Sequence, residues 1–158
     1  MKFAEQLPEG REASKILVKA RAAMNRIELA VRESPRPGYR ENACGSYFRE
    51  ESVNKVLILL DEAESKSHLD GAVRFARAGI LSWAGDYERA AEEYQLVVKT
   101  WPIYRQPARC GLAAALGWLG RLAEAQHVID EYNAVLAASL VPGMPRLDFA
   151  RLGLRTGT

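Results

Sequence analysis

The chain carries few side chains whose types and spacing could perform catalysis or hold a metal ion. Its two histidines, His68 and His127, have no Cys, Asp or Ser in a recognised relationship that would form a base and nucleophile pair. Its two cysteines, Cys44 and Cys110, lie far apart and lack a CxxC spacing, which argues against a zinc site and a disulfide framework. We therefore predict no catalytic residue, no metal site and no cofactor, with an uncharacterised enzyme as an alternative.

Carboxylates and glycines add no stronger signal for chemistry. The acidic runs at 61–64 and 92–93 are adjacent or at helical spacing, which is typical of a solvated helix face. No GxxxxGK[ST] or GxGxxG motif occurs, and Gly79, Gly111 and Gly117 are isolated glycines. The sequence thus shows no phosphate-binding loop.

An Arg-rich loop at 32–49 is the one candidate for nucleic-acid contact, because arginines beside aromatic rings can hold phosphates and stack bases. Its residues of this kind are Arg32, Arg36, Arg40, Arg49, Tyr39, Tyr47 and Phe48. The acids Glu33, Glu41, Glu50 and Glu51 lie within this loop or directly after it, and the net charge of the chain is only +2. We prefer a solvated connecting loop, and a nucleic-acid-associated helical protein stays an alternative.

The composition indicates one all-α domain over 1–158. The chain has 24 Ala and 18 Leu against 19 Val, Ile and Thr together, a balance that favours helix over strand. No apolar run approaches the roughly 20 residues that span a bilayer, and acids interrupt the first nine residues, where a signal peptide would be apolar. We expect a cytoplasmic protein with free thiols and no membrane insertion.

Hydrophobic periodicity predicts two N-terminal helices, at 10–33 and 50–66. A loop from the Ser34-Pro35 step to about Tyr47 should separate them, because prolines disfavour helix in the residues before them. In the second helix, Ile58 and Leu59 widen the apolar face, which predicts burial on two sides.

An internal repeat is predicted in the C-terminal half, with units at about 71–102 and 106–139. A shift of 35 residues gives six identities: Arg74 with Arg109, Ala78 with Ala113, Leu81 with Leu116, Trp83 with Trp118, Gly85 with Gly120, and Ala90 with Ala125. The two glycines should end the first helix of each unit in the αL conformation. Asp86 can cap the following helix, whereas Arg121 cannot. After these units, apolar residues in the tail at 141–158 predict a short helix that folds back as a cap or fills a groove.

These units resemble the tetratricopeptide repeat, whose units of about 34 residues carry small and large packing positions and a closing proline. The resemblance covers 65 to 70 residues and is carried by Ala78, Leu81, Gly85, Tyr87, Ala90, Tyr94 and Pro102, then Ala113, Leu116, Gly120, Leu122, Ala125 and Ile129. It implies an α-solenoid of helical hairpins, here of about six helices plus the short C-terminal helix.

The resemblance also implies a concave groove lined by the first helix of each unit. The groove positions carried over to this chain are Phe75, Gly79, Ser82, Trp83, Cys110, Gly111, Ala114, Gly117 and Trp118. These small and aromatic residues suit an apolar peptide or an amphipathic helix of another protein. The alternative is that the glycines serve hairpin packing, or that the protein's own N-terminal helix or tail fills the groove.

The function expected from this resemblance is non-catalytic protein binding. The chain looks similar in size and architecture to the small cytoplasmic chaperones of type III secretion, which hold apolar segments of secreted subunits. A plain adaptor and a homo-oligomer also fit the sequence.

Overall fold

Helices dominate the computed structural model, which describes residues 8–30, 39–41, 47–66, 71–139 and 146–154. Over these residues the chain forms six α-helices, one 3-10 helix and two short strands. Their bounds are α2 (Pro8–Ala30), β1 (Tyr39–Glu41), β2 (Tyr47–Arg49), α3 (Glu50–Lys66), α4 (Ala72–Trp83), α5 (Tyr87–Thr100), η1 (Pro102–Tyr104, the 3-10 helix), α6 (Arg105–Trp118) and α7 (Leu122–Ala138). The prediction of an all-α stack of helices is confirmed.

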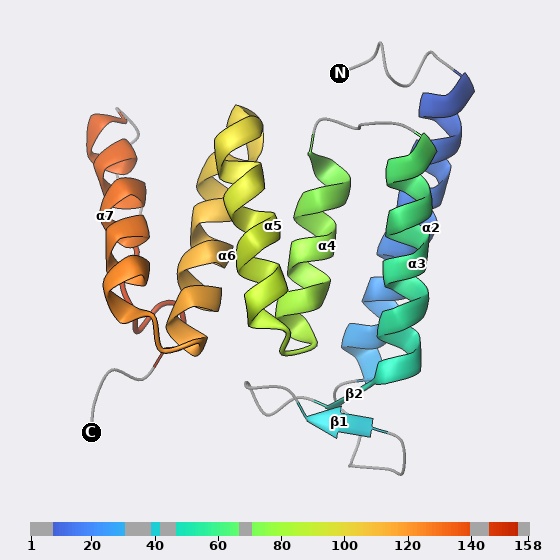
Figure 1. Ribbon diagram of the computed structural model, residues 1–158, viewed down its shortest axis with the longest axis horizontal. Coiled ribbons are helices and arrows are strands. Elements are labelled where there is room, and N and C mark those ends of the chain that lie inside the picture. Colours follow the sequence, from blue (N-terminus) through green and yellow to red (C-terminus); the bar gives the residue numbers. More distant parts are fainter. Residues whose placement is uncertain (1–7, 31–38, 42–46, 67–70, 140–145, 155–158) are drawn as a thin grey trace.

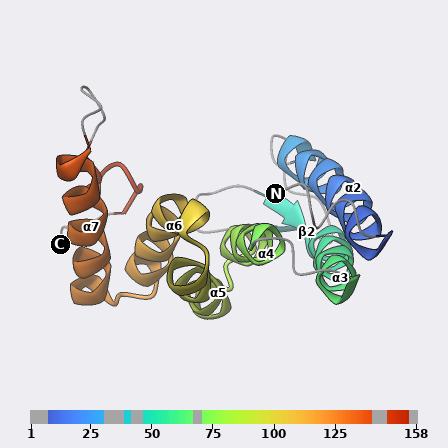
Figure 2. The ribbon, with the colours of Figure 1, turned by 90° about the horizontal axis from the view of Figure 1, so that it is seen from above.

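The six helices stand side by side in chain order, and each packs against the next (Figure 1). Seen from above, the row of helices is curved rather than flat (Figure 2). Helix α3 lies between α2 and α4, which explains why its apolar face is wide. Ile58 is nevertheless 65% exposed, so the expectation that it widens the buried face is wrong.

Helices α4 and α5 form one helical hairpin, and α6 and α7 form a second. The turns inside these two C-terminal hairpins have the predicted geometry. Gly85 and Gly120 have φ values of 85° and 78°, a left-handed conformation in which a side chain would be strained. In both turns the residue after the glycine donates its backbone N–H to a leucine carbonyl five residues earlier, Asp86 to Leu81 and Arg121 to Leu116, each at 2.9 Å. The same bond thus recurs 35 residues later.

Helix capping differs between the two turns, as expected from the residue types. The Asp86 carboxylate accepts a hydrogen bond from the backbone N–H of Arg89 at 3.4 Å, whereas Arg121 makes no side-chain cap. The second turn instead keeps Arg121 available for ion pairs across the surface.

The buried residues form two clusters. One comprises fourteen residues, all on α4 to α7. The other joins α2, α3, β2 and α4, and contains Phe48, which is 1% exposed. Leu57 of α3 packs against both clusters, so the N-terminal helices extend the core of the two hairpins.

Two predictions of local structure need correction. Residues 39–41 and 47–49 pair as antiparallel strands rather than as plain loop, because Phe48 anchors the second strand in the core. Helix α2 is described as far as Ala30, and the last residues of the predicted helix and the proline-rich stretch after it lie outside the described residues. The predicted C-terminal helix is a single turn over 149–153, since Gly153 adopts a φ of 71° and ends it.

Ala90 and Ala125 are fully buried in the cores of the two hairpins. We expect Ala90→Leu and Ala125→Leu each to lower the free energy of unfolding by about 1–3 kcal/mol, because extra methylene groups at a tight crossing force strain. Urea denaturation measures the effect, with Ala137→Leu at an exposed position of α7 as the control. Unchanged midpoints for both buried variants would contradict this packing.

Candidate protein-binding surfaces

The aromatic residues of the predicted groove pack against other rings of the chain. Phe75 stacks on Tyr104 with ring centres 5.6 Å apart and meets Tyr94 edge-on at 6.0 Å. The ring centre of Trp83 lies 5.3 Å from that of the buried Phe48. Strand β2 and η1 therefore occupy part of the surface that these two side chains would offer to a partner.

The three glycines of the predicted groove lie in different surroundings. A Cβ atom on Gly111 would lie 2.3–2.6 Å from three ring carbons of Tyr94, so this glycine permits the close contact between α5 and α6. A Cβ atom on Gly117 would lie 2.2 Å from a methyl group of Leu154. At Gly79 the nearest atom is the Tyr94 hydroxyl, at 3.8 Å. Hairpin packing and the C-terminal segment thus occupy the space above two of the three.

The other predicted groove residues lie along α4 and α6 and are partly accessible. Ser82, Cys110 and Ala114 are half-buried, and Trp118 is 36% exposed. The indole of Trp118 stacks on Tyr87 with ring centres 6.1 Å apart. The two tryptophans that are equivalent in the repeat therefore differ in environment: Trp83 lies against the N-terminal half and Trp118 at the surface of the second hairpin.

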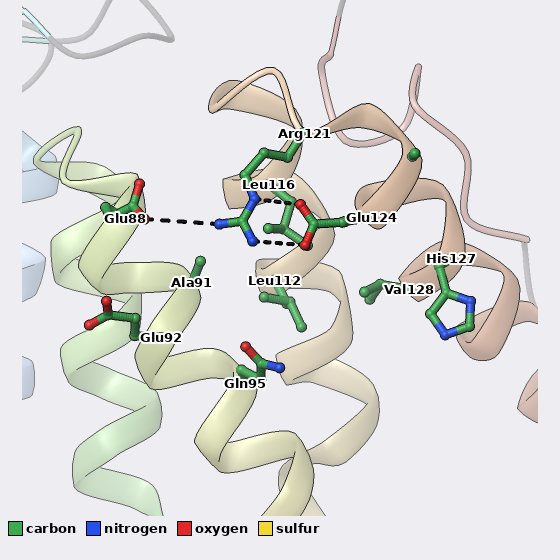
Figure 3. A pocket seen from close by; sticks show the side chains of 11 residues that line it. Glu88, Ala91, Glu92, Gln95, Leu112, Leu116, Arg121, Glu124, His127 and Val128 are labelled. Carbon is green, nitrogen blue, oxygen red and sulfur yellow. Dashed lines mark hydrogen bonds and ion pairs between the residues drawn. The ribbon is translucent and has the colours of Figure 1, made fainter.

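An open groove lies on another face, between α5 and α7. It has a volume of about 610 Å³, and Leu112 and Leu116 of α6 form its floor. Its lining residues are Glu88, Ala91, Glu92, Gln95, Leu112, Leu116, Arg121, Ala123, Glu124, His127 and Val128. We call it the α5–α7 groove. Figure 3 shows that side chains from all three helices face it.

The charge of the α5–α7 groove is negative. Glu88, Glu92 and Glu124 line it against the single guanidinium of Arg121. Arg121 bonds to Glu124 at 2.8 Å and lies 4.0 Å from Glu88, so it bridges α5 and α7 (Figure 3). The hydrogen bond from Arg121 holds the pKa of Glu124 below its ordinary value, so this carboxylate stays charged. Among the lining residues, no second cation balances Glu92.

This groove was missed by the sequence analysis. Glu88 and Glu92 are four residues apart on one face of α5, which is typical of a solvated surface. The groove arises only because α7 places Glu124 and Val128 opposite them, and helical spacing carries no sign of that contact.

The acidic run at 61–64 is only partly a solvated face: Asp61 and Glu62 are exposed, as predicted, whereas Glu64 is partly buried in an ion-pair cluster. Arg77 of α4 is 5% exposed and contacts Asp61 at 2.8 Å, Glu64, and Glu93 at 3.5 Å. Arg74 pairs with the same two glutamates, at 2.7 and 3.2 Å. Burial alone would lower the pKa of Arg77, but these carboxylates raise it above its ordinary value. The cluster joins α3, α4 and α5.

Side chains of the Arg-rich loop are engaged within the chain where the structure describes them. Arg40 pairs with Glu50 at 3.0 Å, and Arg49 lies 3.6 Å from Glu51. Phe48 is buried and cannot stack on a base. Arg32 and Arg36 lie outside the described residues.

The nucleophilic and titratable groups show no assembled reaction centre in the described part of the chain. His127 is exposed and lies 2.7 Å from Glu131, while His68 and Cys44 fall outside the described residues. Burial raises the pKa of the Cys110 thiol, and a hydrogen bond with Tyr132 opposes that shift. No group of three potential metal ligands occurs in the ranges described. No described helix is both long and apolar enough to cross a bilayer.

Comparison of the chain with protein-family models, with curated proteins and with solved structures gives no match. The resemblance to the tetratricopeptide repeat therefore stays a prediction based on the residues quoted for it.

Proposed function

We propose that this chain is a non-catalytic protein-binding module that holds an amphipathic helix of a partner in the α5–α7 groove. The observation that carries this proposal is the open volume of about 610 Å³ between two helices, with an apolar floor supplied by a third. Helix-in-groove recognition places apolar side chains of one face of a helix into such a channel.

The charge of the groove specifies the partner further. Three carboxylates face one guanidinium across a floor made by Ala91, Leu112, Leu116 and Val128. Opposite charge across an interface favours association and disfavours partners with like charge. The partner helix should therefore carry Lys or Arg on both sides of an apolar stripe.

Two synthetic peptides test this function on the full chain. Both carry leucine at i, i+3, i+4 and i+7; one has flanking lysines and the other flanking glutamates. We expect the Lys-flanked helix to bind and Ala123→Trp to weaken that binding at least about tenfold, because Ala123 is exposed and lines the groove. Fluorescence anisotropy measures the affinity. Ala138→Trp, exposed at the end of α7, is the matched control.

A charge-reversal pair tests the acidic rim separately. Glu92→Lys should weaken the Lys-flanked helix about fivefold, within the range expected of exposed charges, while Glu62→Lys on α3 makes the same charge change outside the groove and should have no effect. If neither Ala123→Trp nor Glu92→Lys weakens binding, the groove is not the binding site. Equal affinity for both peptides would refute the claim that the partner helix is basic, but not the claim that it binds in the α5–α7 groove.

A role as a cytoplasmic secretion chaperone is a more specific form of this proposal. It requires that the chain keep a client soluble, whereas an adaptor binds a partner that is already folded. Client solubility with and without the Ala123→Trp variant distinguishes the two roles.

A further inference from the structure

A C-terminal segment, residues 146–154, lies against the second hairpin and is held there by a side-chain clamp. We call it the tail. Asn133 of α7 donates from its amide nitrogen to the Leu147 carbonyl at 2.9 Å and accepts from the Leu147 N–H at 2.8 Å. Asn133 is only 9% exposed, and both halves of its amide are thus used on the main chain of one residue. Such a clamp recognises a peptide backbone rather than a particular side chain.

A second contact inserts one side chain of the tail. Leu154 is 7% exposed and lies over Gly117 of α6, where any side chain larger than hydrogen would collide with its methyl groups. The turn that delivers Leu154 is closed by its own N–H, which donates to the Phe149 carbonyl at 2.9 Å. The contact therefore combines a main-chain clamp with a leucine placed at a fixed distance along the peptide.

The tail lies at the edge of the core and is not part of its centre. All fourteen buried residues of the C-terminal cluster lie on α4 to α7, whereas Leu147, Phe149 and Leu152 are only partly buried against them. Beside the clamp, a hollow of about 460 Å³ is lined by Asp130, Asn133, Ala134, Leu136, Ala137 and Arg146. The tail leaves this hollow open, so a peptide bound at this surface could make contacts that the tail does not make.

We propose that the surface around Asn133 and Gly117 is a second peptide-binding site, distinct from the α5–α7 groove, and that the tail is its resident ligand. The ligand class is a short peptide that offers one residue's main chain to Asn133 and a leucine, seven residues later, to Gly117. A peptide of this kind from another protein binds by displacing the tail.

A truncated chain ending at residue 145 and a labelled synthetic peptide of residues 146–158 test the site. We expect saturable one-to-one binding to the truncated chain and at least tenfold weaker binding to the full chain, because the attached tail competes at high effective concentration. The Leu154→Ala peptide and the truncated chain carrying Asn133→Ala should each lose most of the affinity. Ala123→Trp should change nothing, which separates this site from the proposed function. A folded truncated chain that ignores the peptide would overturn the proposal.

A second variant covers the case in which truncation unfolds the protein. Leu154→Asp in the full chain keeps the tail but prevents its packing on Gly117, and should admit the labelled peptide. If the truncated chain is unfolded and the Leu154→Asp chain excludes the peptide, the tail is a structural cap and the proposal fails. A full chain that is dimeric by light scattering, with exchanged tails, would also overturn it.

Discussion

Gly111→Leu is expected to lower the free energy of unfolding by about 3 kcal/mol, the largest loss that we predict for a single glycine. The reason is the buried ring of Tyr94, three carbons of which lie within 2.6 Å of where the new Cβ would be. The ring also packs edge-on against Phe75, so it cannot move aside without disturbing a second contact. Relief would require α5 and α6 to separate.

Gly79 provides the matched control, because it faces the same tyrosine at ordinary contact distance. Gly79→Ala should raise stability by up to about 1 kcal/mol, the usual gain of alanine over glycine within a helix. Gly111→Ala should lower the stability, although alanine has the same advantage over glycine in a helix there. Thermal and urea unfolding of the two alanine variants decide the matter, and shifts of the same sign would show that the Tyr94 contact is misplaced.

Arg77→Met should cost about 3 kcal/mol of unfolding free energy. Removal of one partner from a buried ion pair leaves the other charge without compensation. Here Glu64 and Glu93, with side chains only 22% and 18% exposed, would keep Arg74 as their one cation in the described cluster. Arg74 moderates the loss, which places it at the lower end of the range for buried pairs.

Two further variants separate charge from packing at Arg77. Arg74→Met should cost clearly less, because its side chain is 33% exposed and solvent screens its charge. Glu64→Gln in the Arg77→Met background should recover part of the loss, since it removes one of the uncompensated carboxylates. Urea unfolding measures both effects. An Arg77→Met chain as stable as the parent would contradict the cluster.

Local features of the fold were predictable from sequence because short-range rules determine them. Periodicity located α3 at 50–66, and Gly85 and Gly120 marked turns that only a left-handed residue forms comfortably. The pairing of strands 39–41 and 47–49 was missed, since the second strand is stabilised by Phe48 packing on the distant Trp83.

The candidate sites depend on contacts between distant segments, and sequence reasoning reached them only in part. The tail was predicted to fold back, but not that Asn133 would hold its backbone. The acidic runs were predicted to lie on solvated helix faces, and two of their residues have different roles. Glu64 pairs with a buried arginine, and Glu92 lines an open groove. Helical spacing is the same in both cases, so only the neighbouring helix distinguishes them.

A map of where the partner helix binds tests the α5–α7 groove most directly. We propose to titrate the ¹⁵N-labelled full chain with the Lys-flanked helix and to record amide chemical shifts. We expect the largest changes on the facing parts of α5 and α7, from Glu88 to Gln95 and from Arg121 to Val128. Changes confined to α2 and α3, or no changes at saturating peptide, would contradict binding in this groove.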